Sequence, residues 1–292
     1  MRISVWITSY NQKAYLKEAI DSVINQTHKP YQIIIVDDCS SDGSQNLIRA
    51  YKNNFPELIH PIFHKQNTGV AQVRIDALNA VEGDLVTYLD GDDWYLPEKL
   101  ESELGCMLDN PGCDIVFSNH QNKNEDGSKV LFEWVESNDD YPPEGDVFQE
   151  VFTRNFPRKS LYKMELVNYN AWKKIGFHDS NLAIYEDYDM RIRLSKYLKV
   201  KYNPRILSEI RLHGQGLSRS NNQIYISSLE YLFKKNLALL KDLDPEQSRR
   251  ILDSIKSILR NHYRKELRAC FRRKQIFRAF TYLVKHQIPP LN

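Results

Sequence analysis

The sequence predicts an α/β fold: a mostly parallel, doubly wound sheet with flanking helices, followed by an all-helical C-terminal extension. Three observations support this prediction. Short apolar runs alternate with helical spacings through residues 1–118, polar and acidic residues follow the ends of those runs, and every pattern beyond residue 220 is helical. Because ligands of open α/β sheets bind beyond the carboxyl ends of the strands, the same pattern predicts where a functional site lies.

Strands and helices are expected to alternate in the first half of the chain. Short apolar runs predict strands at residues 3–8, 32–36, 59–64, 85–89 and 115–118. Apolar residues spaced three or four apart predict helices at residues 16–24, 47–51, 70–77 and 97–108, the last with Leu100, Leu104 and Leu108 on one face. The run at 32–36 is apolar almost throughout, which is typical of a strand buried on both faces.

The pattern loosens after residue 119. Asp126 and Gly127 lie between polar flanks and precede an apolar run, which indicates a hairpin. Helices are expected at residues 168–175 and 186–197.

The extension begins with a clear helix signal. Asp244 is placed as an N-cap before Pro245, and Ile251, Ile255 and Ile258 follow on one face. We therefore expect one domain over residues 1–220, with halves at 1–118 and 119–220, and a separate helical extension over residues 221–292.

The composition is that of an ordinary globular protein. Hydrophobic residues make up 41% and charged residues 27% of the 292 residues. The charge is uneven, because residues 221–292 contain 15 Lys and Arg against six Asp and Glu, whereas residues 1–220 contain 25 against 32. A mildly acidic domain joined to a basic extension suggests two modules with different roles.

No pattern in the sequence indicates export or membrane insertion. The four cysteines have neither C-x-x-C nor zinc-ligand spacing, so free thiols are expected. The chain does not open on a signal peptide pattern, and no apolar run approaches the roughly 18 residues of a membrane span. A cytoplasmic protein is expected, or one bound peripherally at the inner face of the cell membrane.

The most informative segment is Asp90-Gly91-Asp92-Asp93, which follows the apolar run 85–89. Three carboxylates in four residues repel one another, and Mg²⁺ or Mn²⁺, which prefer oxygen ligands and are often shared with phosphates, would hold them together. The alternative is a solvated acidic turn in which Gly91 supplies a positive φ. The position directly after a strand favours the metal.

Three further groups of residues could take part in the same chemistry. Asp38 could cap a helix or bind a base or ribose, and the two roles are compatible. Asp187 heads a predicted helix, where it could stabilise the helix dipole or act as a general base. Arg211 and His213 lie in a glycine-containing loop and could cover a diphosphate or bind the metal, although a lone histidine is more often structural.

Seven motifs, in this order along residues 1–220, resemble those of the family 2 glycosyltransferases. They are residues 7–11 (ITSYN), 35–44 (IVDDCSSDGS), 67–69 (NTG) with Arg74, 88–93 (YLDGDD), 175–179 (IGFHD), 185–189 (YEDYD) with Arg193, and 211–213 (RLH). Each motif is weak alone, but seven in the correct order make an accidental match improbable.

The resemblance implies the GT-A fold and a role for each matching residue. The residues that would bind the nucleotide-sugar are Thr8, Tyr10, Asp38 and Arg74 at the base, Asp90 near the ribose, and Asp92. Asp92 would also bind the metal as part of a D-x-D motif, with His213 as a second ligand. Asp187 would be the general base, supported by Glu186 and Arg211.

The function implied by this resemblance is inverting, metal-dependent sugar transfer. A single sugar, of hexosyl or N-acetylhexosaminyl type, would pass from a nucleotide-diphosphate sugar, with UDP expected, to an acceptor hydroxyl with the help of Mn²⁺ or Mg²⁺. The acceptor would be a carbohydrate or lipid-linked saccharide in cell-surface polysaccharide or glycolipid assembly. The Gln-x-x-Arg-Trp motif of processive members is absent, which favours single addition.

A non-catalytic nucleotide- or sugar-binding scaffold on the same fold is the alternative. Retention of both Asp92 and Asp187 argues against it. A dehydrogenase and a P-loop enzyme are not indicated, because the sequence has neither G-x-G-x-x-G after the first strand nor a P-loop.

Two features leave more than one interpretation open. The extension interleaves basic and apolar residues, so it could pack on the first domain, pack on a second subunit in a homodimer, or bind an anionic membrane. No recognition motif for nucleic acid is present, and none is expected as a partner. Trp134, Phe156 and Trp172 could stack on a sugar ring, although core positions are commoner for aromatic residues.

Overall fold

The first four predicted strands form the parallel end of the sheet. β1 (Ile3–Ser9), β2 (Gln32–Asp37), β3 (Ile59–Phe63) and β4 (Leu85–Asp90) pair in the order β3-β2-β1-β4, all in parallel. Every residue of β2 is buried, as its apolar run predicts. The structure is a computed structural model that describes residues 1–136, 141–214 and 222–287.

The second half of the sheet is mixed. β5 (Trp94–Tyr95), β6 (Ile115–Lys123), β7 (Val130–Glu133), β8 (Leu166–Asn168) and β9 (Val200–Arg211) complete a sheet of nine strands among the described residues. β6 and β9 are parallel, whereas β8 joins β4 to β6 through antiparallel pairs. β5 pairs antiparallel with β9, and β7 pairs antiparallel with β6. The expected α/β sheet is confirmed, with its parallel pairs concentrated at the β3-β2-β1-β4 end, and β6 and β7 form the predicted hairpin.

Three strands lie where the sequence patterns predict none. β5 and β8 are only two and three residues long, too short for a period to be read. β9 is twelve residues long but contains Pro204 and four charged residues. Arg211, which we expected in a loop, is the last residue of β9 and is therefore positioned by the sheet.

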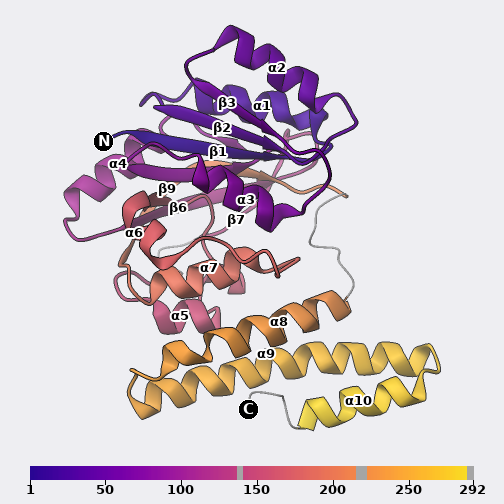
Figure 1. Ribbon diagram of the computed structural model, residues 1–292. Helices are drawn as coiled ribbons and strands as arrows, with labels where there is room; N and C mark the ends of the chain where they lie inside the picture. Colours follow the sequence, from indigo (N-terminus) through magenta and orange to yellow (C-terminus); the bar gives the residue numbers. More distant parts are fainter. Residues whose placement is uncertain (137–140, 215–221, 288–292) are drawn as a thin grey trace.

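Helices cover both faces of the parallel end (Figure 1). α1 (Lys13–Ile24) and α2 (Ser44–Asn54) lie on one face and α3 (Val70–Asn79) lies on the other. The second half carries α4 (Lys99–Asp109), α5 (Phe148–Thr153), the 3-10 helix η2 (Pro157–Lys159), α6 (Tyr169–Ile175) and α7 (Glu186–Ser195). Leu100 and Leu104 of α4 are buried as expected, but Leu108 is 59% exposed because Met107 takes the inward position.

The extension is helical throughout residues 222–287. α8 (Asn222–Asn236), the 3-10 helix η4 (Leu237–Leu240), α9 (Pro245–Arg272) and α10 (Ile276–Gln287) lie below the sheet in the view of Figure 1. The helix signal at Asp244 is confirmed, because its carboxylate accepts hydrogen bonds of 3.0 Å from the N–H groups of Glu246 and Gln247. The expected domain boundary at residues 220–221 lies outside the described residues, and the expected division at residues 118–119 falls within β6.

Aromatic residues at the three positions considered for sugar stacking belong to the core. Trp134 is 1% exposed, Phe156 6% and Trp172 0%. Trp134 packs against Phe156 with ring centroids 6.4 Å apart, and its indole N–H donates to the carbonyl of Pro157. The four cysteines are unpaired. Among the described residues, no helix combines the length and the apolar character that crossing a bilayer requires.

Candidate active site

The carboxyl ends of β2, β1 and β4 meet at one edge of the sheet. In the parallel register, Ser9 lies opposite Asp37 and Thr8 lies opposite Asp90. The backbone N–H of Asp38 also donates to the carbonyl of Ser9 at 2.9 Å. The polar residues that follow three separate strands are therefore brought to one edge, as the topology predicts.

Arg74 joins this edge to the start of α7. Its guanidinium lies 3.3 Å from the carboxylate of Asp90 and 3.1 Å from that of Glu186. The same group lies over the ring of Tyr88, and Asp90 also accepts a hydrogen bond of 3.0 Å from the hydroxyl of Thr8. Four predicted site residues thus form one connected group, and Arg74 is its buried centre.

Asp187 is held beside this group by a second buried arginine. Arg191 lies one helical turn further along α7 and donates to Asp187 at 2.6 Å. The other side of its guanidinium contacts Glu165 at 3.0 Å and the hydroxyl of Tyr88 at 2.7 Å. Arg191 and Glu165 have side chains only 1% exposed, whereas the side chain of Asp187 is 37% exposed. A rigid cation therefore presents a carboxylate to the surface.

The two acidic residues at the start of α7 have different charge behaviour. Burial raises the pKa of Asp187, but Arg191 and Arg74 outweigh burial and hold it below the usual range. Burial also raises the pKa of Glu186. Arg74 lowers this pKa and the charge of Asp187 raises it, and the result is a pKa of about 7. Asp187 is thus ionised at neutral pH, where Glu186 is only partly ionised, and its side chain is the more exposed of the two.

Asp92 faces His213 across the loop that follows β4. The Nε2 atom of His213 lies 2.8 Å from a carboxylate oxygen of Asp92. Burial and the neighbouring Asp90 raise the pKa of Asp92, while the hydrogen bond with His213 opposes them. This is the environment in which a bound cation would favour the charged carboxylate.

Gly91 is required by close approach and not by a positive φ. A Cβ atom at this position would lie 2.5 Å from the carbonyl oxygen of Thr8 and 2.7 Å from Gln12 Oε1. Gly91 is absent from the residues with positive φ, so the turn that we considered as an alternative is wrong in this respect. The glycine lets the acidic loop lie directly against the end of β1.

Arg211 fixes the acidic loop to the end of β9. Its backbone N–H donates to Asp93 at 2.8 Å, and its side chain donates to the carbonyl of Asp92 at 3.0 Å. The guanidinium also contacts Glu18 and lies between the rings of Tyr15 and Trp94, 4.6 Å from each centroid. Arg211 therefore holds the acidic loop in place. A direct contact of its guanidinium with diphosphate would need the carbonyl of Asp92 and the carboxylate of Glu18 to move.

Lys163 is a cation at the site that the motifs do not reveal. Burial raises the pKa of Asp93 well above its usual range, Asp92 and Asp90 add to this effect, and the charge of Lys163 opposes it. The same lysine charge is among the causes that lower the pKa of Asp187. Lys163 is exposed and its charge acts on both carboxylates.

Asp38 is used by the protein itself. Its carboxylate accepts hydrogen bonds from the N–H groups of Thr68 and Gly69, from the Thr68 hydroxyl, and contacts Nδ1 of His64, all at 2.8–2.9 Å. Only 3% of Asp38 is exposed, whereas Tyr10 is 49% exposed. Asp38 shapes the segment before α3, and its contact with a base stays a prediction.

His178 is a buried polar residue that the motifs include but do not explain. It is 7% exposed, and neither ring nitrogen has a hydrogen-bond partner among the described residues. Burial lowers its pKa far below the usual range, and the neighbouring Arg74 adds to this, so the ring is neutral. The sequence motifs include neither Arg191 nor Glu165. The one sequence signal for Arg191 is its four-residue spacing from Asp187, which is that of an ion pair on a helix.

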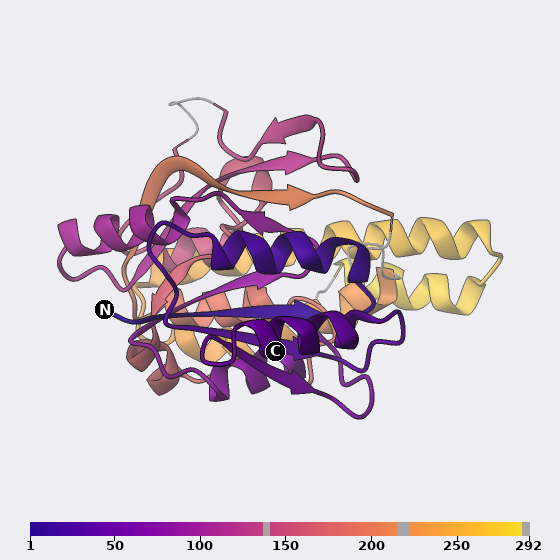
Figure 2. The ribbon, with the colours of Figure 1, turned by 90° about the horizontal axis from the view of Figure 1, so that it is seen from above.

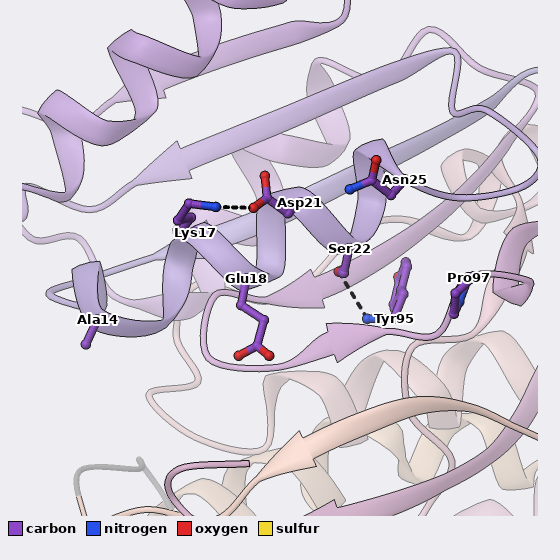
Figure 3. Close-up of a pocket in the computed structure, with 8 residues that line it drawn as sticks. All are labelled: Ala14, Lys17, Glu18, Asp21, Ser22, Asn25, Tyr95 and Pro97. Atoms are coloured by element: carbon purple, nitrogen blue, oxygen red, sulfur yellow. Dashed lines mark hydrogen bonds and ion pairs between the residues drawn. The ribbon is translucent and has the colours of Figure 1, made fainter. Parts of the chain in front are cut away.

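A surface groove of about 470 Å³ lies along α1 (Figure 3). It is lined by Ala14, Lys17, Glu18, Asp21, Ser22, Asn25, Tyr95 and Pro97, none of which is a predicted site residue. The groove contains the ion pair of Lys17 and Asp21, both directed along the helix surface.

The pair Asp92 and His213 fits a divalent cation that is shared with a ligand. A carboxylate oxygen and an imidazole nitrogen already face each other at 2.8 Å. Among the residues that the structure describes, no three His, Cys, Asp or Glu side chains are grouped to hold a metal unaided. Mg²⁺ commonly takes one or two carboxylates and completes its shell with substrate phosphates and water, so two ligands are sufficient.

The N-terminal half of the chain matches one family model. Residues 4–169 match the model of glycosyl transferase family 2, which covers more than half of the chain. The protein belongs to this family. The matched residues include the motifs from 7–11 to 88–93, whereas those at 175–179, 185–189 and 211–213 lie beyond them.

A curated relative agrees with this membership. TuaG of Bacillus subtilis (strain 168), named as a teichuronic acid biosynthesis glycosyltransferase, is 35% identical over 128 residues. The aligned segment covers 44% of this chain and 50% of TuaG, so the chain matches only half the length of that relative. The likeness supports the family and does not extend to a shared substrate.

Two solved structures share the fold across nearly the whole chain. S. aureus TarS 1–349 in complex with UDP-GlcNAc has a TM-score of 0.64 and 16% identity, covering 98% of this chain and 92% of that one. The mannosyltransferase PcManGT from Pyrobaculum calidifontis in complex with GDP-Man and Mn²⁺ has a TM-score of 0.58 and 14% identity, covering 99% and 88%. At such identities the likeness establishes the fold alone, and the expected GT-A fold is confirmed.

Proposed function

We propose that this protein transfers a single sugar from a nucleotide-diphosphate sugar to an acceptor hydroxyl with inversion at the anomeric carbon. The proposal rests on the two ion pairs of Arg74, one with Asp90 and one with Glu186. They bring the acidic loop close to Asp187, whose side chain is 37% exposed. A donor diphosphate at the loop and an acceptor hydroxyl at Asp187 would then be neighbours.

The reaction needs one displacement. The acceptor oxygen forms a bond to carbon 1 of the donor sugar as the bond from carbon 1 to the diphosphate oxygen breaks, and the diphosphate leaves with the electron pair. Asp187, which is ionised at neutral pH and partly exposed, takes the proton of the acceptor hydroxyl as the new bond forms. Attack opposite the leaving group inverts the anomeric centre, and no covalent intermediate is required.

The groups around Asp187 prepare it for this role. Arg191 fixes the carboxylate on one side and is itself fixed by Glu165, so Asp187 is oriented before the acceptor binds. Asp92 and His213 would hold Mn²⁺ or Mg²⁺, which when bound supplies positive charge to the departing diphosphate. Lys163 would add a second positive charge from the protein.

The donor and acceptor classes are also proposals. UDP as the nucleotide, with a hexose or N-acetylhexosamine, is supported by the UDP-GlcNAc complex of TarS, which has the same fold. A carbohydrate or lipid-linked saccharide acceptor in cell-surface polysaccharide or glycolipid assembly is supported by the name of TuaG. Residues 1–118 would bind the donor, 119–220 the acceptor, and 221–292 would form a separate module.

Titration calorimetry with nucleotide diphosphates and their sugars, with and without Mn²⁺, tests donor binding. We expect one UDP-sugar to bind more tightly with Mn²⁺, and NMR of the transfer product to reveal the inverted anomer. Retention of configuration would exclude the single displacement. Tight binding without transfer to any acceptor or to water would favour the alternative of a non-catalytic scaffold.

A further inference from the structure

A strip of exposed apolar side chains lies at the end of the extension. Phe271, at the end of α9, is 62% exposed, and Phe277 and Phe280 of α10 are 93% and 66% exposed. Leu283 and Val284 are 41% and 45% exposed. Full burial of one such side chain is worth about 1.5–3 kcal/mol, so the concentration of five within fourteen residues indicates a surface that something covers.

The rotation of α10 is fixed, so the strip cannot turn inward. Ala279 is 2% exposed, and the ring of Tyr282 lies 6.3 Å from that of Tyr263 on α9. Lys285 forms an ion pair of 2.8 Å with Glu230 of α8. Phe280 and Val284 follow Phe277 by three and seven residues, which places all three together on the outward side of the helix.

Basic residues lie at one end of the strip, beside the turn before α10. Residues 271–287 contain five Lys and Arg and no Asp or Glu. Arg272, the last residue of α9, and Arg273 and Lys274 of the turn that follows it are all exposed, and the three are called the basic turn. None of the three is ion-paired with a described residue, whereas Arg250 near the other end of α9 pairs with Glu246.

We propose that the apolar strip and the basic turn, here called the hairpin face, bind an anionic membrane surface. Aromatic side chains next to arginine and lysine suit the boundary between acyl chains and acidic headgroups. Pairing with a second copy of the chain is disfavoured, because a two-fold interface would place the same cations opposite one another.

The position of the hairpin face agrees with a membrane-linked acceptor. In Figure 1, α10 is the helix farthest from the sheet. Figure 2, turned by 90°, shows the ends of α9 and α10 projecting beyond the sheet on the side to which β1 points, which is the side of the candidate active site. The end of the hairpin that carries the basic turn therefore lies on the same side of the sheet as the carboxyl ends of its parallel strands.

Co-sedimentation with vesicles tests the proposal without any need for transfer activity. Vesicles of phosphatidylcholine with 30% phosphatidylglycerol should sediment the full chain at 50 mM NaCl, and binding should weaken at 500 mM NaCl. Vesicles of phosphatidylcholine alone should bind it at least tenfold more weakly. Equal binding to both vesicle types, or no binding to either, would overturn the proposal.

Two variants separate the contributions of the hairpin face. Arg272→Ala with Arg273→Ala and Lys274→Ala should weaken binding about fivefold for each charge removed. Phe277→Ser with Phe280→Ser should weaken it at least tenfold. Controls on other exposed positions, Arg249→Ala with Arg250→Ala and Val130→Ser with Leu131→Ser, should leave binding unchanged.

Analytical ultracentrifugation of the same variants addresses the competing occupant. We expect a monomer for the parent chain and for the phenylalanine variant, with melting temperatures that agree closely because the changed side chains are exposed. A parent dimer that the phenylalanine changes dissociate would assign the hairpin face to a second copy of the chain and contradict the membrane proposal.

Discussion

Two groups of carboxylates lie at the same edge of the sheet but are held in different ways. Asp37 and Asp38 are 0% and 3% exposed, and their oxygens accept hydrogen bonds from hydroxyl, amide and backbone N–H groups of adjacent loops. Asp90 and Asp187 each contact a buried arginine, yet their side chains are 36% and 37% exposed. The first pair holds the loops in place, and the second pair keeps oxygens available for a ligand.

This difference teaches that position after a strand does not by itself define a catalytic carboxylate. Asp38 directly follows β2 and Asp90 is the last residue of β4, and these two strands flank β1. What separates them is the partner, because each carboxylate oxygen of Asp38 accepts a hydrogen bond from a backbone N–H group, whereas Thr8 and Arg74 both contact the same oxygen of Asp90, its Oδ1. The following substitutions test whether the two groups do have separate roles.

The largest effect is expected for Asp187→Asn. Loss of the general base should lower kcat by about 10² to 10⁴-fold, measured by release of nucleoside diphosphate in the presence of acceptor. The donor dissociation constant should change less than threefold, because Arg191 keeps its contacts with Glu165 and Tyr88.

Asp84→Asn is the matched control for that substitution. Asp84 is also paired with an arginine, Arg2, but lies directly before β4 at the opposite edge of the sheet. Its removal should leave kcat unchanged. If the two substitutions lower kcat equally, the loss reflects stability and Asp187 is not the base.

Asp92→Asn should weaken the dependence on Mn²⁺. Since an amide is a poorer metal ligand than a carboxylate, the apparent Mn²⁺ affinity should fall by roughly 10 to 100-fold, with donor affinity unchanged in the absence of metal. The measurement is donor titration at fixed Mn²⁺ concentrations. A variant with the Mn²⁺ dependence of the parent would remove Asp92 from the metal site.

Asp38→Asn should act mainly on stability. The amide nitrogen cannot accept a hydrogen bond, so at least one buried donor from Thr68 or Gly69 loses its partner, at a cost of about 1–3 kcal/mol. Denaturant unfolding without ligand measures this loss. Unchanged stability with strongly reduced donor affinity would instead make Asp38 a direct contact of the base.

The smallest effect concerns the acid side of the stability profile. Burial raises the pKa of Asp179, but its hydrogen bond with Lys235 and those from Asn181 and Tyr231 outweigh burial and bring it to about 2. Its contribution to stability is therefore present above the unfolded pKa of about 3.9 and is lost as pH falls towards 2. Asp179→Asn should flatten the stability profile below pH 4, and a profile parallel to that of the parent would contradict this assignment.

Much of the fold could be predicted where the pattern is local. The strands and helices up to β4 follow from apolar runs and spacings within short windows, and α9 follows from Asp244 and the isoleucines behind it. β9 could not be predicted, because its parallel pairing with β6 buries polar residues such as Asn203 and Glu209 that look like loop residues in isolation. β5 exists only through its pairing with β9.

The site followed the same rule. The acidic loop was predictable because a buried strand delivers three carboxylates to one place, and Asp187 because it heads a helix. Lys163 and Glu165 were not, since neither lies in a motif: Glu165 pairs with Arg191 of another segment, and Lys163 acts on Asp93 and Asp187 through its charge. Ion pairs between distant segments leave no spacing in the sequence to detect.

Crystals of the protein soaked with UDP and Mn²⁺ test the central claim most directly, through the anomalous signal of manganese. The account predicts a single strong peak bonded to Asp92, with His213 adjacent and the diphosphate at the carboxyl edge of β1 and β4. Manganese or nucleotide bound elsewhere, for instance in the groove along α1, would contradict it.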